Sequence, residues 1–135
     1  MFKRMSLTLV LVLVMGSVLT ACGGTPAPVT LSSLPVFTGA TEATSEAMVA
    51  GLGAMNDATK ADGTIQAFES KAYDLPAGTT FDALVAFYKP ALEKAGWTLA
   101  ISSAPNLAFA RGKQALNFGY VEVVSGILVL LSTVK

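Results

Sequence analysis

Residues 80–97 read TFDALVAFYKPALEKAGW, and this stretch decides the fold class of the 135-residue chain. Its apolar residues recur every three or four positions, which is the spacing of one helix face: Phe81, Leu84, Val85, Tyr88, Leu92 and Ala95. The threonines at 79 and 80 are favourable N-caps, and Gly96 suits the left-handed conformation that ends many helices. The pattern predicts a helix over residues 80–95, with a kink where Pro90 removes a backbone hydrogen bond.

The chain after Trp97 changes to a period of two, which is typical of strands. Four runs follow this pattern: residues 98–102, 107–111, 114–123 and 127–134. Gly112-Lys113 places its glycine first, as a two-residue type II′ hairpin requires. The last run is apolar on both faces from Ile127 to Leu131, so we expect a central strand with cover on each side, or a contact between two copies of the chain.

The part of the chain ahead of this helix is less regular. Residues 64–75 alternate and are predicted to form a strand. Residues 46–61 carry apolar side chains at helical spacing, and Ser45 is a suitable cap. Gly51 and Gly53 each destabilise a helix interior by up to about 1 kcal/mol, so this segment is predicted to be a short or broken helix.

Together these elements predict one α+β domain. A mostly antiparallel sheet of about five strands would carry the helix of residues 80–95 on one face, with the short or broken helix preceding it. The strand before the main helix and the strand after it could pair in parallel through a right-handed crossover.

The N-terminus has the pattern of a secretory signal. Lys3 and Arg4 are followed by an uncharged apolar stretch, SLTLVLVLVM, over residues 6–15, and then by small residues. The apolar run is about half the length that a membrane-spanning helix needs. We therefore expect a segment that directs export and is then removed.

The end of this segment, Leu19-Thr20-Ala21-Cys22, resembles the lipobox of bacterial lipoprotein precursors. The resemblance implies that the Cys22 thiol receives a diacylglycerol, that the signal is cut before Cys22, and that the new amine is acylated. Several acyl chains would hold the protein stably on a membrane of the cell envelope. Gly23 occupies the position where an Asp would favour the inner membrane, so the outer membrane is favoured if the host has one. The alternative is an ordinary signal that happens to end in these four residues.

The resemblance divides the chain into three parts. Residues 1–21 would be the lipoprotein signal peptide, and residues 22–34 would be the lipidated cysteine with a flexible tether rich in Gly, Pro, Ser and Thr. Residues 35–135 would form the single α+β domain.

A second resemblance covers most of the chain beyond the tether. Phe87-Tyr88-Lys89, Leu92 and Gly96-Trp97, with the earlier segment at residues 35–40, are similar to a pattern in uncharacterised secreted bacterial proteins whose aromatic-pair helix ends in Gly-Trp. This likeness implies a shared fold and no particular activity. The residues themselves indicate packing, with Tyr88 and Leu92 facing the sheet.

Composition argues against several classes of function. The chain has no histidine, which removes the usual catalytic base, and its single cysteine cannot form an internal disulfide or a multi-cysteine metal site. Loss of the signal would leave seven basic and nine acidic residues, a net charge of −2. A weakly acidic chain without a basic run is a poor binder of nucleic acid and lacks a polybasic patch for anionic lipid. We expect no nucleic-acid partner, no metal and no cofactor.

Several polar residues could suggest a chemical site, but each has an ordinary structural explanation. Glu69 and Asp74 could act as a carboxylate pair, yet a solvated strand face explains them better. Carboxylate and amide residues also occur over 56–63, without the spacing of a calcium loop. Arg111 and Lys113 could meet an anion, but charged residues are common beside exposed turns. No catalytic residue is predicted.

Four aromatic residues could line an apolar pocket, although their strand period favours the core: Trp97, Phe109, Phe118 and Tyr120.

The favoured function is a non-enzymatic, membrane-anchored module that binds or supports another envelope component. The alternatives are a carrier of a small apolar ligand, with a pocket between helix and sheet, and a small hydrolase that uses Ser, Lys or carboxylates.

Overall fold

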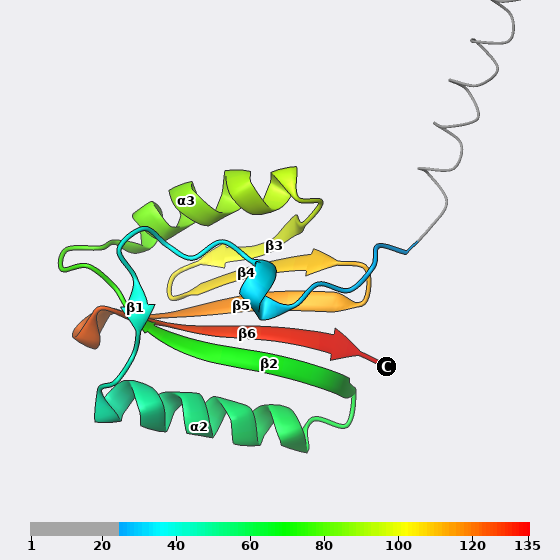
Figure 1. The fold of residues 1–135 in the computed structure, drawn as a ribbon, viewed down its shortest axis with the longest axis horizontal. Helices are drawn as coiled ribbons and strands as arrows, with labels where there is room; N and C mark the ends of the chain where they lie inside the picture. The colour runs from blue at the N-terminus through cyan, green and yellow to red at the C-terminus, as the bar shows by residue number, and fades with distance from the viewer. Residues whose placement is uncertain (1–24) are drawn as a thin grey trace, which may run out of the picture.

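The computed structural model describes residues 25–135. The predicted signal and Cys22 lie outside the described residues. The described chain is an α+β domain with a six-stranded sheet in the order β1-β2-β6-β5-β4-β3, and every neighbouring pair is antiparallel (Figure 1). The expectation of about five strands is therefore one too few, because it omitted the two-residue β1.

The elements follow one another along the chain with short connections. Their bounds are η1 Leu31–Ser33, β1 Thr41–Glu42, α2 Glu46–Ala61, β2 Ile65–Asp74, α3 Phe81–Lys94, β3 Thr98–Ser103, β4 Asn106–Arg111, β5 Gln114–Val121, η2 Glu122–Val124 and β6 Gly126–Val134. The two α-helices lie on opposite sides of the sheet (Figure 1).

Helix α3 confirms the prediction for residues 80–95 to within a residue at each end. The Thr80 hydroxyl accepts a hydrogen bond from the Ala83 amide at 3.1 Å, so Thr80 is the N-cap. Pro90 lies inside a helix that continues to Lys94. Tyr88 and Leu92 are buried against the sheet, and the Tyr88 ring centroid lies 4.2 Å from that of Phe118 on β5.

Helix α2 differs from the short or broken helix that the sequence predicted, because it is continuous over sixteen residues. Packing explains the difference. Met48 fills the space above Gly126, and Gly51 brings the helix backbone close to the Leu128 side chain. Burial against β2 and β6 offsets the cost of the helix glycines, and the Ser45 hydroxyl caps the Met48 amide at 3.4 Å.

The proposed parallel pairing of the strands on either side of α3 is wrong. β2 pairs with β1 and β6, whereas β3 pairs with β4 at the far edge of the sheet. Helix α3 therefore carries the chain across the sheet from one half to the other. β6 takes the central place because it is apolar on both faces, as predicted. Ile127, Val129 and Leu131 face the α3 side, and Leu128 alternates with them toward α2.

The described part of the segment predicted as a tether packs on the α3 side of the sheet. The Gln114 side chain makes two hydrogen bonds of 2.9 Å with the backbone of Val29. The Leu31 amide donates to Glu69 Oε2 at 3.0 Å, and the Leu31 side chain is buried in the core. Packing therefore extends back from Pro35 to Thr25, which is three residues from Cys22.

Tyr88 links this segment to α3, and it gives a pH prediction. Its hydroxyl accepts a hydrogen bond from the Phe37 amide at 3.1 Å, and burial raises the pKa of Tyr88 to about 12. An unfolded tyrosine ionises near pH 10, so between these values the folded state holds the proton that the unfolded state loses. We expect the free energy of unfolding contributed by Tyr88 to be complete below pH 10 and to fall by about 2 kcal/mol as the pH rises through 12.

The measurement is urea denaturation of the parent and of Tyr88→Phe at pH 8 and at pH 11.5. Tyr88→Phe should lose part of this alkaline decrease, while other groups titrate equally in both proteins. An identical decrease in both proteins would contradict the assignment.

Candidate functional site

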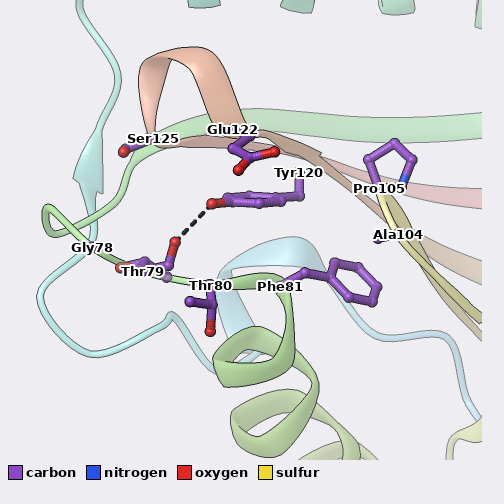
Figure 2. Close-up of a pocket in the computed structure, with 9 residues that line it drawn as sticks. All are labelled: Gly78, Thr79, Thr80, Phe81, Ala104, Pro105, Tyr120, Glu122 and Ser125. Carbon is purple, nitrogen blue, oxygen red and sulfur yellow. Dashed lines mark hydrogen bonds between the residues drawn. The ribbon is translucent and has the colours of Figure 1, made fainter.

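The largest hollow described lies at the end of the domain where α3 begins. It is an open cleft of about 680 Å³ between the start of α3, the turn joining β3 to β4, and the segment after β5 (Figure 2). Its lining residues are Gly78, Thr79, Thr80, Phe81, Ala104, Pro105, Tyr120, Glu122 and Ser125.

Hydrogen bonds fix the walls of this cleft to one another. The Tyr120 hydroxyl donates to the Thr79 carbonyl at 2.7 Å, and the Tyr120 amide donates to the Pro105 carbonyl at 2.8 Å. Ser125 has a left-handed backbone (φ 46°), and its carbonyl accepts from the Leu75 amide at 2.7 Å. Tyr120 thus joins the helix start to the β3–β4 turn.

The cleft combines an aromatic wall with a carboxylate. The Tyr120 ring lies near its centre in Figure 2, with Glu122 on one side and Phe81 on the other. The ring centroids of Phe81 and Tyr120 are 6.5 Å apart, and Glu122 is exposed. An aromatic surface beside a carboxylate suits a group that has an apolar body and a positive charge.

The end of the domain around this cleft is acidic. Five carboxylates lie there because strand ends, helix starts and connections meet at that end: Glu42, Glu46, Asp74, Asp82 and Glu122. The segments that build it, residues 41–46, 74–82, 103–106 and 121–126, contain no Lys or Arg. The local charge therefore favours a cationic ligand over an anionic one.

The structure does not bring the sequence-derived carboxylate candidates together. Glu69 and Asp74 point to opposite faces of β2, and Glu69 binds the Leu31 amide. Asn56 accepts from the Ser70 hydroxyl, and two hydrogen bonds from Thr64 lower the pKa of Asp62. Among residues 25–135 no three His, Cys, Asp or Glu side chains gather closely enough to hold a metal ion.

Of the remaining sequence-derived candidates, Arg111 and three aromatic residues have structural roles, and Tyr120 lines the cleft. Arg111 Nη1 donates to the Ala27 carbonyl at 2.7 Å. The hairpin beside it has the expected form, with Gly112 at φ 58°. Three of the four aromatic candidates are buried in the core, namely Trp97, Phe109 and Phe118. Tyr120 instead lines the cleft.

Sequence reasoning missed Glu122 and Ser125 as cleft residues, since a solvated strand end and a turn explain both. The one local signal was the threonine pair at 79 and 80, which marks the start of a helix. The pairing of β2 with β6, which sets Asp74 opposite Gly126, brings the segment that leads into α3 to the same end as Glu122.

Two other spaces in the described chain have smaller volumes than the cleft. The space between α3, β5 and the N-terminal segment is about 10 Å³, so side chains fill it. On the opposite face, an open hollow of about 380 Å³ lies beside α2 and is lined in part by Met55, Ile101, Asn117 and Leu128.

No protein-family model, curated protein or solved structure matches this chain. Within the described part of the chain, no helix combines the length and the apolar composition that crossing a membrane requires.

Proposed function

We propose that the chain is a membrane-anchored envelope lipoprotein, acylated at Cys22 after removal of residues 1–21, whose domain is a non-enzymatic binding module. The lipobox-like residues 19–22 support the anchor. If the host has an outer membrane, Gly23 favours that membrane. The cleft carries the binding proposal, because it lies at the opposite end of the domain from Thr25, where the chain continues toward the anchor (Figure 1).

A binding role fits the cleft better than catalysis. Its single carboxylate has no second acid in the lining, and the chain contains no histidine to act as a base. The Tyr120 hydroxyl is already committed to the Thr79 carbonyl. A small hydrolase is therefore the least supported of the functions considered.

The partner that the cleft fits is a basic segment of another envelope protein. A Lys or Arg side chain can lay its aliphatic part or guanidinium on Tyr120 and Phe81 while its charge meets Glu122. The five carboxylates at this end would also attract the segment over a longer range. Because the cleft is open, it can admit an extended chain.

The test is a photo-crosslinker placed at Val123, which is 92% exposed beside Glu122. We expect a specific envelope protein to be captured through a basic segment, and Glu122→Lys to reduce its yield at least tenfold because charge repulsion replaces attraction. A crosslinker at Ala86, exposed on α3 away from the cleft, is the control. Equal capture from Val123 and Ala86, or capture unaffected by Glu122→Lys, would contradict the proposal.

A carrier of a small apolar ligand is a second candidate, supported by the hollow beside α2. Met55, Ile101 and Leu128 offer it apolar surface. The hollow is open along the uncovered part of the sheet, whereas carriers bury most of their ligand, so we place this function after partner binding.

A further inference from the structure

Basic residues gather at the end of the domain opposite the acidic cleft, although they are scattered along the sequence. They comprise Lys60 in the last turn of α2, Lys94 in the last turn of α3, Arg111 and Lys113 beside the β4–β5 hairpin turn, and Lys135 after β6. We call these five residues the basic end. The strands run between this end and the acidic cleft (Figure 1).

Direct contacts hold these residues close to one another. The Val134 amide donates to the Lys113 carbonyl at 3.0 Å, and the Lys135 amide donates to the Thr64 carbonyl at 3.0 Å, just after the end of α2. On the other side, Arg111 Nε lies 3.6 Å from the position of a side chain at Gly96, two residues after Lys94. The basic end is therefore one continuous surface.

The charges of the basic end are available to a partner. The ion pair found in the described chain joins Lys89 to Glu93 at 3.4 Å, along the exposed side of α3, and involves none of the five. Four of the five side chains are exposed, and Arg111 is half-buried. Two acidic residues share this end: the Asp62 carboxylate accepts hydrogen bonds from Thr64, and Glu93, in the last turn of α3, pairs with Lys89.

The chain leaves the domain at this same surface. Thr25 and Pro26 lie against Gly112, 3.3 Å from the position of a side chain there, and Arg111 holds the Ala27 carbonyl. Two residues, Gly23 and Gly24, lie between Cys22 and Thr25, and the three steps along the chain span at most about 10 Å. That reach is close to the Debye length of about 8 Å at physiological salt, so an anchored domain keeps the basic end within range of headgroup charges.

We propose that the basic end is a contact surface for anionic lipid headgroups of the membrane that holds the anchor. This inference rests on the proposed acylation of Cys22. Contact at the basic end would orient the domain with its strands pointing away from the bilayer. The acidic cleft would then stand about 30 Å from the surface, the length of the nine-residue β6.

The test is lysine footprinting of the membrane-purified protein in vesicles, with an amine-reactive reagent and mass spectrometry. In vesicles rich in phosphatidylglycerol, we expect Lys60, Lys94, Lys113 and Lys135 to react several-fold more slowly than in phosphatidylcholine vesicles. Lys71 and Lys89, which lie away from the basic end, should react equally in both, and 1 M NaCl should remove the difference. The mass of the N-terminal peptide, read in the same samples, reports the acylation of Cys22 separately.

Two double variants of equal net charge distinguish an effect of the basic end from an effect of the protein's overall charge. Each basic residue near an anionic surface strengthens binding about fivefold, so Lys113→Gln/Lys135→Gln should weaken the headgroup contact about 25-fold and thereby remove the protection of Lys60 and Lys94. Lys71→Gln/Lys89→Gln should leave that protection unchanged. Equal reactivity in both kinds of vesicle, equal loss in both variants, or protection by soluble polyphosphate without protection by anionic vesicles would each overturn the proposal.

Discussion

Cys22→Ser is expected to abolish acylation of the protein and to stop its processing at residue 21. In the proposed lipoprotein the thioether to diacylglycerol would form on the Cys22 sulfur, and the chain has no second cysteine that could replace it. In a bacterium that processes lipoproteins, the variant should incorporate no labelled palmitate and should migrate at the larger size of a precursor that keeps its signal. The parent should incorporate the label and migrate as the shorter form.

The control keeps one thiol in the chain but moves it. Cys22→Ser/Ser102→Cys carries its cysteine on the exposed edge strand β3, far along the sequence from residues 19–21. This double variant should also remain unlabelled, because the lipobox pattern requires the cysteine directly after Ala21. If Cys22→Ser stays in the membrane fraction at the processed size of the parent, the lipid anchor is refuted.

Leu92→Ala is expected to lower the free energy of unfolding by about 3 kcal/mol. The Leu92 side chain is fully buried between α3 and the sheet, so its truncation removes apolar contacts and leaves a cavity under the helix. The surroundings cannot collapse freely, because Tyr88 and Trp97, which belong to the same buried cluster, are held by their own packing. Urea denaturation of the parent and the variant measures the difference.

Val123→Ala is the matched control for this truncation. Val123 is 92% exposed, so the loss of its methyl groups should change the free energy of unfolding by less than about 0.5 kcal/mol. A change as small for Leu92→Ala would mean that α3 does not pack on the sheet as described.

The elements with a strong local signal could be predicted closely. Helix α3 combines an apolar stripe with a threonine cap, and the Gly112-Lys113 turn joins two alternating strands, so each depends on neighbours in the sequence. The predictions failed where distant contacts decided the outcome. Burial against β6 keeps α2 continuous despite Gly51 and Gly53. Hydrogen bonds with the side chains of Gln114 and Glu69 fix a segment whose composition is typical of a flexible tether.

The candidate sites also differ in whether they depend on neighbouring residues or on distant contacts. Cys22 could be proposed from four adjacent residues and their position after an apolar stretch. The cleft could not be proposed from the sequence, because Thr80 and Glu122 are 42 positions apart and are brought together by the order of the strands.

The sequence by itself determined the α+β class, the main helix, the central β6 and the lipobox-like motif, because each depends on residues that lie near one another along the chain. The tertiary structure alone decided where charge accumulates. The sequence contains no basic run, and a polybasic patch was not expected. Antiparallel strands bring alternate connections to the same end of a sheet, so Lys113 and Lys135 meet at one end and Asp74 and Glu122 at the other.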